Sequence, residues 1–223
     1  MQSGALPWLK KLQLSRKIHP WIIEDLPPGK KPVSCKWVYR VKYNADGSIQ
    51  QCKARLIIHG NHQIEGFYYN ETFVPVSKIT SIRRFLSVAV VKSWELHQMD
   101  INNAFLHGEL DKELFMRMPP GFCSNSPNKV CRLKKSLCGL RQAPRQWFAK
   151  LSSKLSEYGF VHSYEDYSLF IYYTETVFVA LLEYVDDILL ASNNAQASQK
   201  FKTYLNDSFS IKDLGKIEIL SWH

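Results

Sequence analysis

The sequence lacks the paired cysteines that zinc sites and disulfide frameworks use. Its five cysteines are odd in number, and no two of them stand at the Cys-x-x-Cys spacing. This usage indicates a reducing compartment. His59 and His62 form a His-x-x-His pair near Cys52, but no second half of a zinc-ligand pattern follows. We therefore expect the two histidines to be ordinary surface or core side chains.

Long hydrophobic runs are missing too. No uninterrupted apolar segment approaches the roughly 18 residues of a membrane-spanning helix. Residues 1–7 have neither the basic start nor the apolar core of a signal peptide, and the chain has no repeat or low-complexity tract. These absences favour a soluble intracellular protein that has no membrane partner.

Negative charge is scarce relative to positive charge. The chain has 20 Asp and Glu residues against 29 Lys and Arg residues, which gives a formal net charge of +9. Such an excess favours a phosphate-rich partner, although a merely solvated basic surface would give the same composition. The 223 residues suffice for a substantial core and for two subdomains.

Part of the positive charge lies on a predicted β-hairpin. Strand-like segments at residues 36–42 and 48–58 flank the turn Asn44-Ala45-Asp46-Gly47. Alternation along the first strand puts its basic residues on the face opposite Trp37, Tyr39 and Val41. The basic residues of the two strands are Lys36, Arg40, Lys42, Lys53 and Arg55. This face suits phosphate binding, and a solvated sheet edge would have the same pattern.

Two adjacent carboxylates interrupt the most apolar segment of the chain. Asp186 and Asp187 follow Tyr184 and Val185 within residues 177–191, which are otherwise nearly all apolar and β-prone. Half-buried carboxylates are unfavourable unless a cation or a metal ion compensates their charge. A tight turn between two strands is the simpler explanation, since Asp is common in turns.

A third carboxylate favours a metal site over a simple turn. Asp100 lies at the end of a short strand-like segment, where alternation places it on one face with Leu96 and Gln98. Two carboxylates on a hairpin and one on another strand make an oxygen site suited to Mg²⁺, with Mn²⁺ as a substitute. A pair of such ions about 3.5–4 Å apart supports in-line nucleotidyl transfer.

Three helices are predicted from apolar spacing and end signals. Residues 77–94 have helical periodicity behind Ser and Thr start signals, and this helix leads into the Asp100 strand. Residues 144–158 begin at Pro144, end before Gly159 and place Trp147 on a core stripe. Asn194 can cap the third helix. The order of strands and helices predicts an α+β fold with helices on one face of a mostly antiparallel sheet.

Eight sequence blocks are informative when they are taken together. They are Lys53-Ala-Arg-Leu56, Tyr69-Asn-Glu-Thr-Phe-Val-Pro-Val76, Leu96-His-Gln-Met-Asp-Ile-Asn-Asn-Ala-Phe-Leu-His-Gly108, Met118-Pro-Pro-Gly-Phe122, Val130-Cys-Arg-Leu133, Gly139-Leu-Arg-Gln-Ala-Pro144, Tyr184-Val-Asp-Asp187 and Ile211-Lys-Asp-Leu-Gly215. One Tyr-x-Asp-Asp motif is a weak signal, but eight ordered blocks are specific. They occur in the order and at the spacing seen in copia-type retrotransposon reverse transcriptases, which the chain resembles over roughly residues 21–215.

The resemblance implies an RNA-directed DNA polymerase domain of a Pol polyprotein with a right-hand polymerase core. Residues 21–76 and 109–138 would form the fingers, and residues 77–108 and 139–223 the palm, after a lead-in segment at residues 1–20. An RNA template, a DNA or tRNA primer and deoxynucleoside triphosphates (dNTPs) would be its partners. A cytoplasmic virus-like particle would be its location.

The resemblance also assigns roles to individual residues. Two Mg²⁺ ions would be held by Asp100, Ile101, Asp186 and Asp187, the three aspartates being catalytic. Arg55 would grip the triphosphate, and Phe105 would exclude a 2′-hydroxyl. The positions implied for nucleotide binding are Arg55, Lys42, Asn103, Ala104, Phe105, Gly139 and Gln142, and those for nucleic-acid binding are Lys36, Arg40, Lys53 and Tyr184.

Some positions depart from the family pattern. His59 stands where a lysine is expected, Cys138 where a tyrosine is expected and Glu183 where an apolar residue is expected. After Gly215, the expected Tyr-Phe-Leu-Gly-Ile-Glu-Val is replaced, so we expect an altered primer-holding segment and a missing thumb.

Three interpretations follow from these features. The first is a reverse transcriptase fragment, and the second is a catalytically inactive remnant that only binds nucleic acid. The third is an untemplated nucleotidyl cyclase or terminal transferase on a similar palm, which the block at residues 139–144 argues against.

Overall fold

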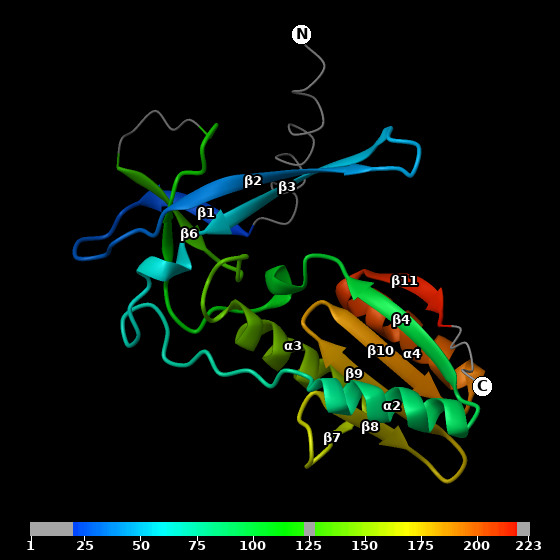
Figure 1. Cartoon of the computed structure of the whole chain (residues 1–223). Helices are drawn as coiled ribbons and strands as arrows, with labels where there is room; N and C mark the ends of the chain where they lie inside the picture. Colours follow the sequence, from blue (N-terminus) through cyan, green and yellow to red (C-terminus); the bar gives the residue numbers. More distant parts are fainter. Residues whose placement is uncertain (1–19, 123–127, 218–223) are drawn as a thin grey trace. The chain divides into compact units, whose positions relative to one another are not determined.

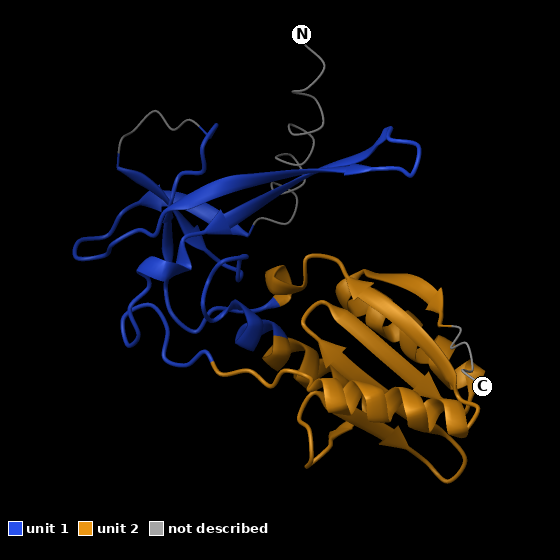
Figure 2. Ribbon diagram, in the orientation of Figure 1, with its two compact units in different colours: residues 1–72, 108–147 blue, residues 73–107, 148–223 orange. Residues whose placement is uncertain are grey.

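The computed structural model describes residues 20–122 and 128–217. Most of the expected lead-in, residues 1–19, and most of the altered segment after Gly215, residues 218–223, lie outside the described residues. The chain divides into two compact units (Figure 2). Unit 1 comprises residues 1–72 and 108–147, and unit 2 comprises residues 73–107 and 148–223.

Unit 1 contains two small antiparallel sheets (Figure 1). One has the order β1-β6-β5, with β1 at Trp21–Asp25, β6 at Lys129–Leu133 and β5 at Phe115–Arg117. The other is the predicted hairpin, formed by β2 at Cys35–Tyr43 and β3 at Ile49–Ile58. A parallel bridge between Val33 and Met116 joins the chain before β2 to β5. Both bridging residues are buried, so they belong to the core of this unit.

Unit 2 is built on one antiparallel sheet of six strands with the order β11-β4-β10-β9-β8-β7. These strands are β4 at Glu95–Ile101, β7 at Val161–His162, β8 at Leu169–Tyr173, β9 at Phe178–Tyr184, β10 at Asp187–Ser192 and β11 at Ile211–Lys216. The central position of β10 and β4 places the ends of both strands, where the aspartates lie, side by side. β11 contains the last of the eight sequence blocks, Ile211-Lys-Asp-Leu-Gly215.

Helices cover both faces of this sheet. α2 at Ile79–Val91 packs Phe85 and Ala89 against one face, together with Ala180 and Leu182 of β9. α4 at Ala195–Phe209 lies on the opposite face, where its Lys202 reaches the β4 side chain His97. The expectation of helices on one face only is therefore wrong. β9 and β10 are nearly continuous apolar runs because both of their faces are buried.

The start of α2 also differs from the prediction. Its N-cap is Lys78, without a capping side chain, and Ser77 instead donates its hydroxyl to the backbone carbonyl of Glu183. Asp166, before β8, lies against this end of the helix. Burial would raise the pKa of Asp166, but hydrogen bonds from Ser168, Ser81 and the Lys78 amide hold it below its ordinary value. The start of α2 is thus in contact with residues that are distant in sequence.

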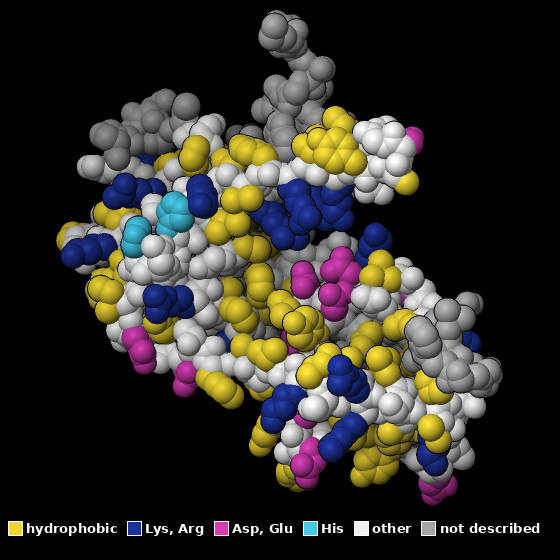
Figure 3. Space-filling model, viewed as in Figure 1, with side chains coloured by type: hydrophobic (Ala, Val, Ile, Leu, Met, Phe, Trp, Pro, Cys, Tyr) yellow, Lys and Arg dark blue, Asp and Glu magenta, His cyan; other side chains and the backbone are white. Residues whose placement is uncertain are grey.

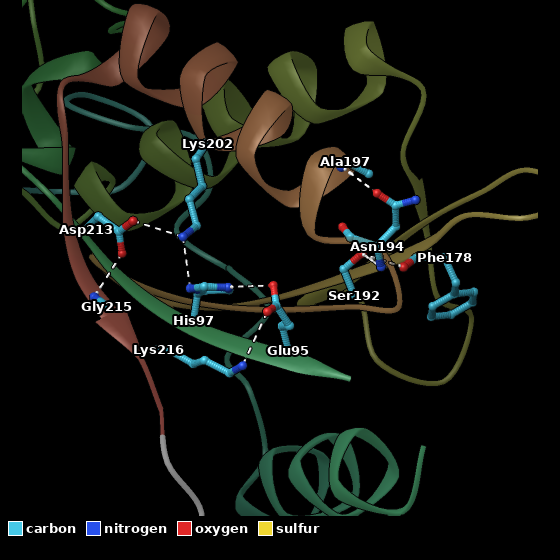
Figure 4. A network of polar contacts seen from close by, with 10 residues as sticks. All are labelled: Glu95, His97, Phe178, Ser192, Asn194, Ala197, Lys202, Asp213, Gly215 and Lys216. Atoms are coloured by element: carbon cyan, nitrogen blue, oxygen red, sulfur yellow. Dashed lines mark hydrogen bonds and ion pairs between the residues drawn. The ribbon is translucent and has the colours of Figure 1, made fainter. Parts of the chain in front are cut away.

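The other two helices follow the sequence signals closely. α3, at Ala143–Tyr158, buries Trp147, Leu151 and Leu155, and Gly159 follows it with φ at +108°. At the start of α4, the Asn194 side chain accepts a hydrogen bond from the Ala197 amide at 2.9 Å (Figure 4). The three helices and the antiparallel sheets agree with the α+β class. None of the helices in residues 20–122 and 128–217 is long and apolar enough to cross a lipid bilayer.

A polar network fastens α4 to two strands of the sheet (Figure 4). The Lys202 Nζ donates to Nδ1 of His97 and to Oδ2 of Asp213, at 2.9 Å in both cases. Glu95 extends the network, since its carboxylate lies 3.6 Å from Nε2 of His97 and 3.2 Å from Nζ of Lys216. The network thereby links α4, β4 and β11, and β4 is the strand that carries Asp100.

We expect Lys202→Met to destabilise unit 2 by about 1–3 kcal/mol, because Nδ1 of His97 and Oδ2 of Asp213 lose the donor that they share. The loss should lie at the low end of this range, because the Asp213 side chain is 42% exposed and its Oδ1 keeps a hydrogen bond from the Gly215 amide. Urea denaturation measures the change. Lys200→Met on the exposed side of the same helix is the control, and equal effects of both substitutions would contradict the role of the network.

Candidate functional site

The Tyr184-Val185-Asp186-Asp187 segment forms a tight hairpin turn between β9 and β10. Tyr184 pairs with Asp187, so Val185 and Asp186 are the two central residues of the turn. Val185 has φ at +61°, whereas Asp186 is not among the residues with positive φ. A positive φ at the first central position is typical of turns that favour glycine there, and it is strained for a β-branched residue. The backbone of this turn is therefore held in an unusual conformation.

Asp187 and Asp100 are direct cross-strand neighbours on β10 and β4. Residues paired in this way lie with Cβ atoms about 4.5–5.5 Å apart, and like charges at such positions repel each other. The Ile101 amide donates to the Asp186 carbonyl at 2.9 Å, which ties the turn to the end of β4. Figure 3 shows Asp and Glu side chains gathered at this end of the sheet. The tight turn that the sequence also allowed is therefore present, and the pairing of Asp187 with Asp100 makes it part of an acidic site.

The backbone therefore brings together the four positions implied to hold metal, namely Asp100, Ile101, Asp186 and Asp187. Within the described residues, no three His, Cys, Asp or Glu side chains converge closely enough to form a closed metal site. The carboxylate oxygens nevertheless match what Mg²⁺ prefers, which is one or two protein carboxylates completed by substrate phosphates and water. Asp187 Oδ1 accepts a hydrogen bond from Gln98 at 3.4 Å.

Lys212 is a residue of this site that the sequence analysis left without a role. It pairs with Asp100 from the other side, so Asp187, Asp100 and Lys212 form a row across three strands. The Lys212 side chain is exposed. Because directly paired residues share a face of the sheet, its side chain lies on the face of the two carboxylates. The Lys-Asp-Leu-Gly block was the available signal, but the block alone does not reveal which strand Lys212 pairs with.

The remaining predicted residues of unit 2 lie just after β4. Ala104 and Phe105 begin the 3₁₀ helix η2 at Ala104–His107. Asn103 is exposed with φ at +55°, Ala104 is buried and Phe105 is half-buried. Phe105 follows Asp100 by five residues, and its ring is therefore carried on the segment that leaves the acidic end of β4.

The predicted basic residues of unit 1 share one face of the β2–β3 hairpin. Arg40 pairs with Lys53 and Val38 pairs with Arg55, which places both β3 cations on the face of Lys36 and Lys42. Figure 3 shows Lys and Arg side chains along one side of the hairpin and hydrophobic ones on the other. Because Arg40 and Lys53 are direct neighbours of like charge, this face favours an anionic partner.

Gly139 and Gln142 have clear structural reasons for their identity. A Cβ on Gly139, where φ is +93°, would lie 2.1 Å from the Ile58 carbonyl oxygen, so no larger residue fits. The Gln142 side chain is buried, accepts a hydrogen bond from Gln63 at 3.0 Å and donates to the Tyr68 carbonyl at 3.3 Å. Both residues lie in unit 1. Their predicted influence on a nucleotide pocket stays a prediction.

Glu183 is an acid close to the turn that is not one of the predicted site residues. Glu183, on β9, is 3% exposed, and desolvation by burial raises the pKa of its carboxyl to about 8 despite a hydrogen bond from the Val185 amide. It is therefore mostly protonated at neutral pH. In the sequence, Glu183 is visible only as an acid at a position where an apolar residue is expected.

Comparisons with known proteins match most of the chain. A family model described as reverse transcriptase (RNA-dependent DNA polymerase) matches residues 18–220. The chain is 45% identical over 197 residues to the retrovirus-related Pol polyprotein from transposon RE1 of Arabidopsis thaliana. It is 39% identical over 208 residues to the corresponding polyprotein from transposon TNT 1-94 of Nicotiana tabacum. These matches cover 87% and 92% of this chain but only 13% and 16% of the relatives, so the chain spans a small part of their length.

Proposed function

Because the chain belongs to the reverse transcriptase (RNA-dependent DNA polymerase) family and is of the copia type, we propose that it forms the polymerase core of a retrotransposon Pol polyprotein. The proposed reaction is attack of a primer 3′-hydroxyl on the α-phosphate of a dNTP, directed by an RNA template. The partners would be the template, a DNA or tRNA primer and dNTPs, within a cytoplasmic virus-like particle.

One observation supports the chemistry most directly, which is the placement of Asp186 and Asp187 beside Asp100. Asp187 and Asp100 are paired across two central strands, and Asp186 lies in the adjoining turn. Two Mg²⁺ ions, when bound to these carboxylates and to the Ile101 carbonyl, would activate the attacking hydroxyl and stabilise the leaving phosphate. The chain's own contribution is to hold the carboxylates on rigid strands, so that the ions and phosphates meet fixed ligands.

The two units suit the fingers and palm of a right-hand polymerase. In this proposal, unit 1 is the fingers, and the basic face of the β2–β3 hairpin contacts phosphates. Arg55 and Lys42 would bind the triphosphate, and Lys36, Arg40 and Lys53 the nucleic acid. Unit 2 is the palm, where Tyr184 would contact the primer-template next to the aspartates.

Primer extension on an RNA template with Mg²⁺ and dNTPs tests the proposal. It is measured for this chain and for a chimera that carries the tobacco relative's continuation after Gly215. We expect templated products that require the metal, weak with the chain itself and stronger with the chimera. Untemplated products would favour a terminal transferase. Salt-sensitive binding of nucleic acid without extension by either protein would favour the inactive remnant.

Phe105→Ala should lower the preference for dNTPs over ribonucleotides by at least about tenfold, because it removes the ring proposed to collide with the 2′-hydroxyl. The incorporation ratio of dNTP to rNTP in the chimera measures the effect. Tyr164→Ala, the truncation of an exposed aromatic residue in unit 2, is the control and should leave the ratio unchanged. An unchanged ratio in Phe105→Ala would contradict the proposed gate.

A further inference from the structure

Glu183 is the buried acid that the proposed chemistry does not use. It lies in β9, where the burial pattern of the neighbouring residues is that of an apolar strand. Its cross-strand partner is Ile188, whereas Asp187 pairs with Tyr184 and with Asp100. Successive residues of a strand face opposite sides of the sheet. The Glu183 carboxyl therefore lies on the face opposite Asp100 and Asp187, and it is not a metal ligand.

The carboxyl of Glu183 has a hydrogen-bond partner in the turn between β9 and β10. It accepts a hydrogen bond from the backbone amide of Val185, two residues further along the chain. Val185 is the first central residue of the turn, with φ at +61°. A β-branched residue adopts this conformation only when its surroundings enforce it. The contact from Glu183 is such an enforcing interaction.

The backbone of Glu183 is itself fixed. Its amide donates to the Ser168 carbonyl at 2.9 Å, and its carbonyl accepts the Ser77 hydroxyl at 2.6 Å. The Ser77 and Ser168 hydroxyls lie 2.7 Å apart, and both serines are buried. Glu183 is thus anchored through its main chain, while its side chain reaches the turn.

We propose that Glu183 is a positioning residue that holds the Val185 amide and so keeps Asp186 and Asp187 in their metal-binding conformation. The role of the two aspartates rests on the proposed function. Without the acceptor, the turn keeps only its ladder bonds and the bond from the Ile101 amide to the Asp186 carbonyl, and Val185 relaxes towards negative φ. Because Asp186 and Asp187 follow it directly, that change would turn their side chains away from Asp100.

Two variants of Glu183 separate positioning from general stability. Glu183→Gln keeps a carbonyl oxygen as the acceptor for Val185, whereas Glu183→Leu fills a similar volume without any acceptor. Backbone amide hydrogen exchange of Val185 reports on the turn, and Mn²⁺ titration followed by electron paramagnetic resonance reports on the carboxylates. Thermal unfolding shows that each variant is folded. Glu183→Leu should be at least as stable as the native chain, because it removes a buried acid.

We expect Glu183→Leu to speed exchange at Val185 by roughly tenfold, the scale of one lost hydrogen bond, and to weaken Mn²⁺ binding by a similar factor. Glu183→Gln should not speed exchange at Val185, and its Mn²⁺ affinity should stay within about twofold of that of the native chain. Unchanged exchange in Glu183→Leu would overturn the proposal, as would faster exchange with unaltered Mn²⁺ affinity. If the native chain binds no Mn²⁺, the proposed function fails at its metal site, and the Val185 exchange rate still decides whether Glu183 holds the turn.

Discussion

Asp186→Asn is expected to reduce templated primer extension by roughly a thousandfold or more while leaving the fold intact. The substitution keeps an oxygen but removes one negative charge from a site whose other carboxylates come from Asp100 and Asp187. Metal ions supply several kcal/mol of transition-state stabilisation, and about 4 kcal/mol corresponds to a factor of a thousand. The activity of the chimera with and without the substitution gives the ratio.

The matched control for this prediction is Asp207→Asn, which makes the same chemical change on the exposed side of α4. It should leave primer extension and Mn²⁺ binding unchanged. Circular dichroism and urea denaturation show whether Asp186→Asn is folded. If folded Asp186→Asn extends primers at the parent rate, Asp186 does not hold a catalytic metal.

Glu183→Gln is expected to stabilise unit 2 by about 3 kcal/mol at pH 7. Burial raises the pKa of the Glu183 carboxyl from an ordinary value of 4.5 to about 8, so the folded chain binds a proton that the unfolded chain releases. Stability from this group is fully present below pH 4.5 and is lost as the pH rises through 8. Glutamine does not titrate, and it retains the acceptor for the Val185 amide.

The difference between the native chain and Glu183→Gln should therefore depend on pH in a defined direction. It should be small near pH 4, grow between pH 4.5 and 8, and level off above pH 8. Urea denaturation at fixed pH values measures it. Glu165→Gln, on an exposed position of the same unit, is the control and should show no such growth. A difference that is constant from pH 5 to 8 would mean that Glu183 is ionised in the folded chain.

Local signals in the sequence predicted the elements whose causes are local. Asn194 caps α4 as expected, because capping involves atoms three residues apart. The Trp147 stripe is buried as the helical spacing of α3 indicates, and the β2–β3 hairpin forms around its turn. The local pattern and the family resemblance also pointed to the three aspartates, of which Asp100 and Asp187 lie near strand ends and Asp186 lies in the adjoining turn.

The features that could not be predicted depend on contacts between residues far apart in sequence. Ser77 reads as a helix start signal, yet its hydroxyl bonds to residues about a hundred positions away. The apolar run through β9 and β10 indicates burial on both faces, but which helix covers which face depends on the path of the whole chain. Lys212 has meaning only through its register with Asp100. The hydrogen bond between Glu183 and the Val185 amide could not be predicted either, because it depends on the backbone conformation of Val185.

The strand order of unit 2 has a consequence for how the protein folds. β9 and β10 are joined by a two-residue turn and can pair quickly, whereas β4 meets β10 only after the intervening part of the chain, which includes part of unit 1, has been spanned. Closing so long a loop delays contacts between strands far apart in sequence. Asp186 and Asp187 should therefore reach their turn early in folding, and Asp100 should join them late. During synthesis, β4 leaves the ribosome well before its partner exists, so the acidic site is among the last features of the chain to assemble.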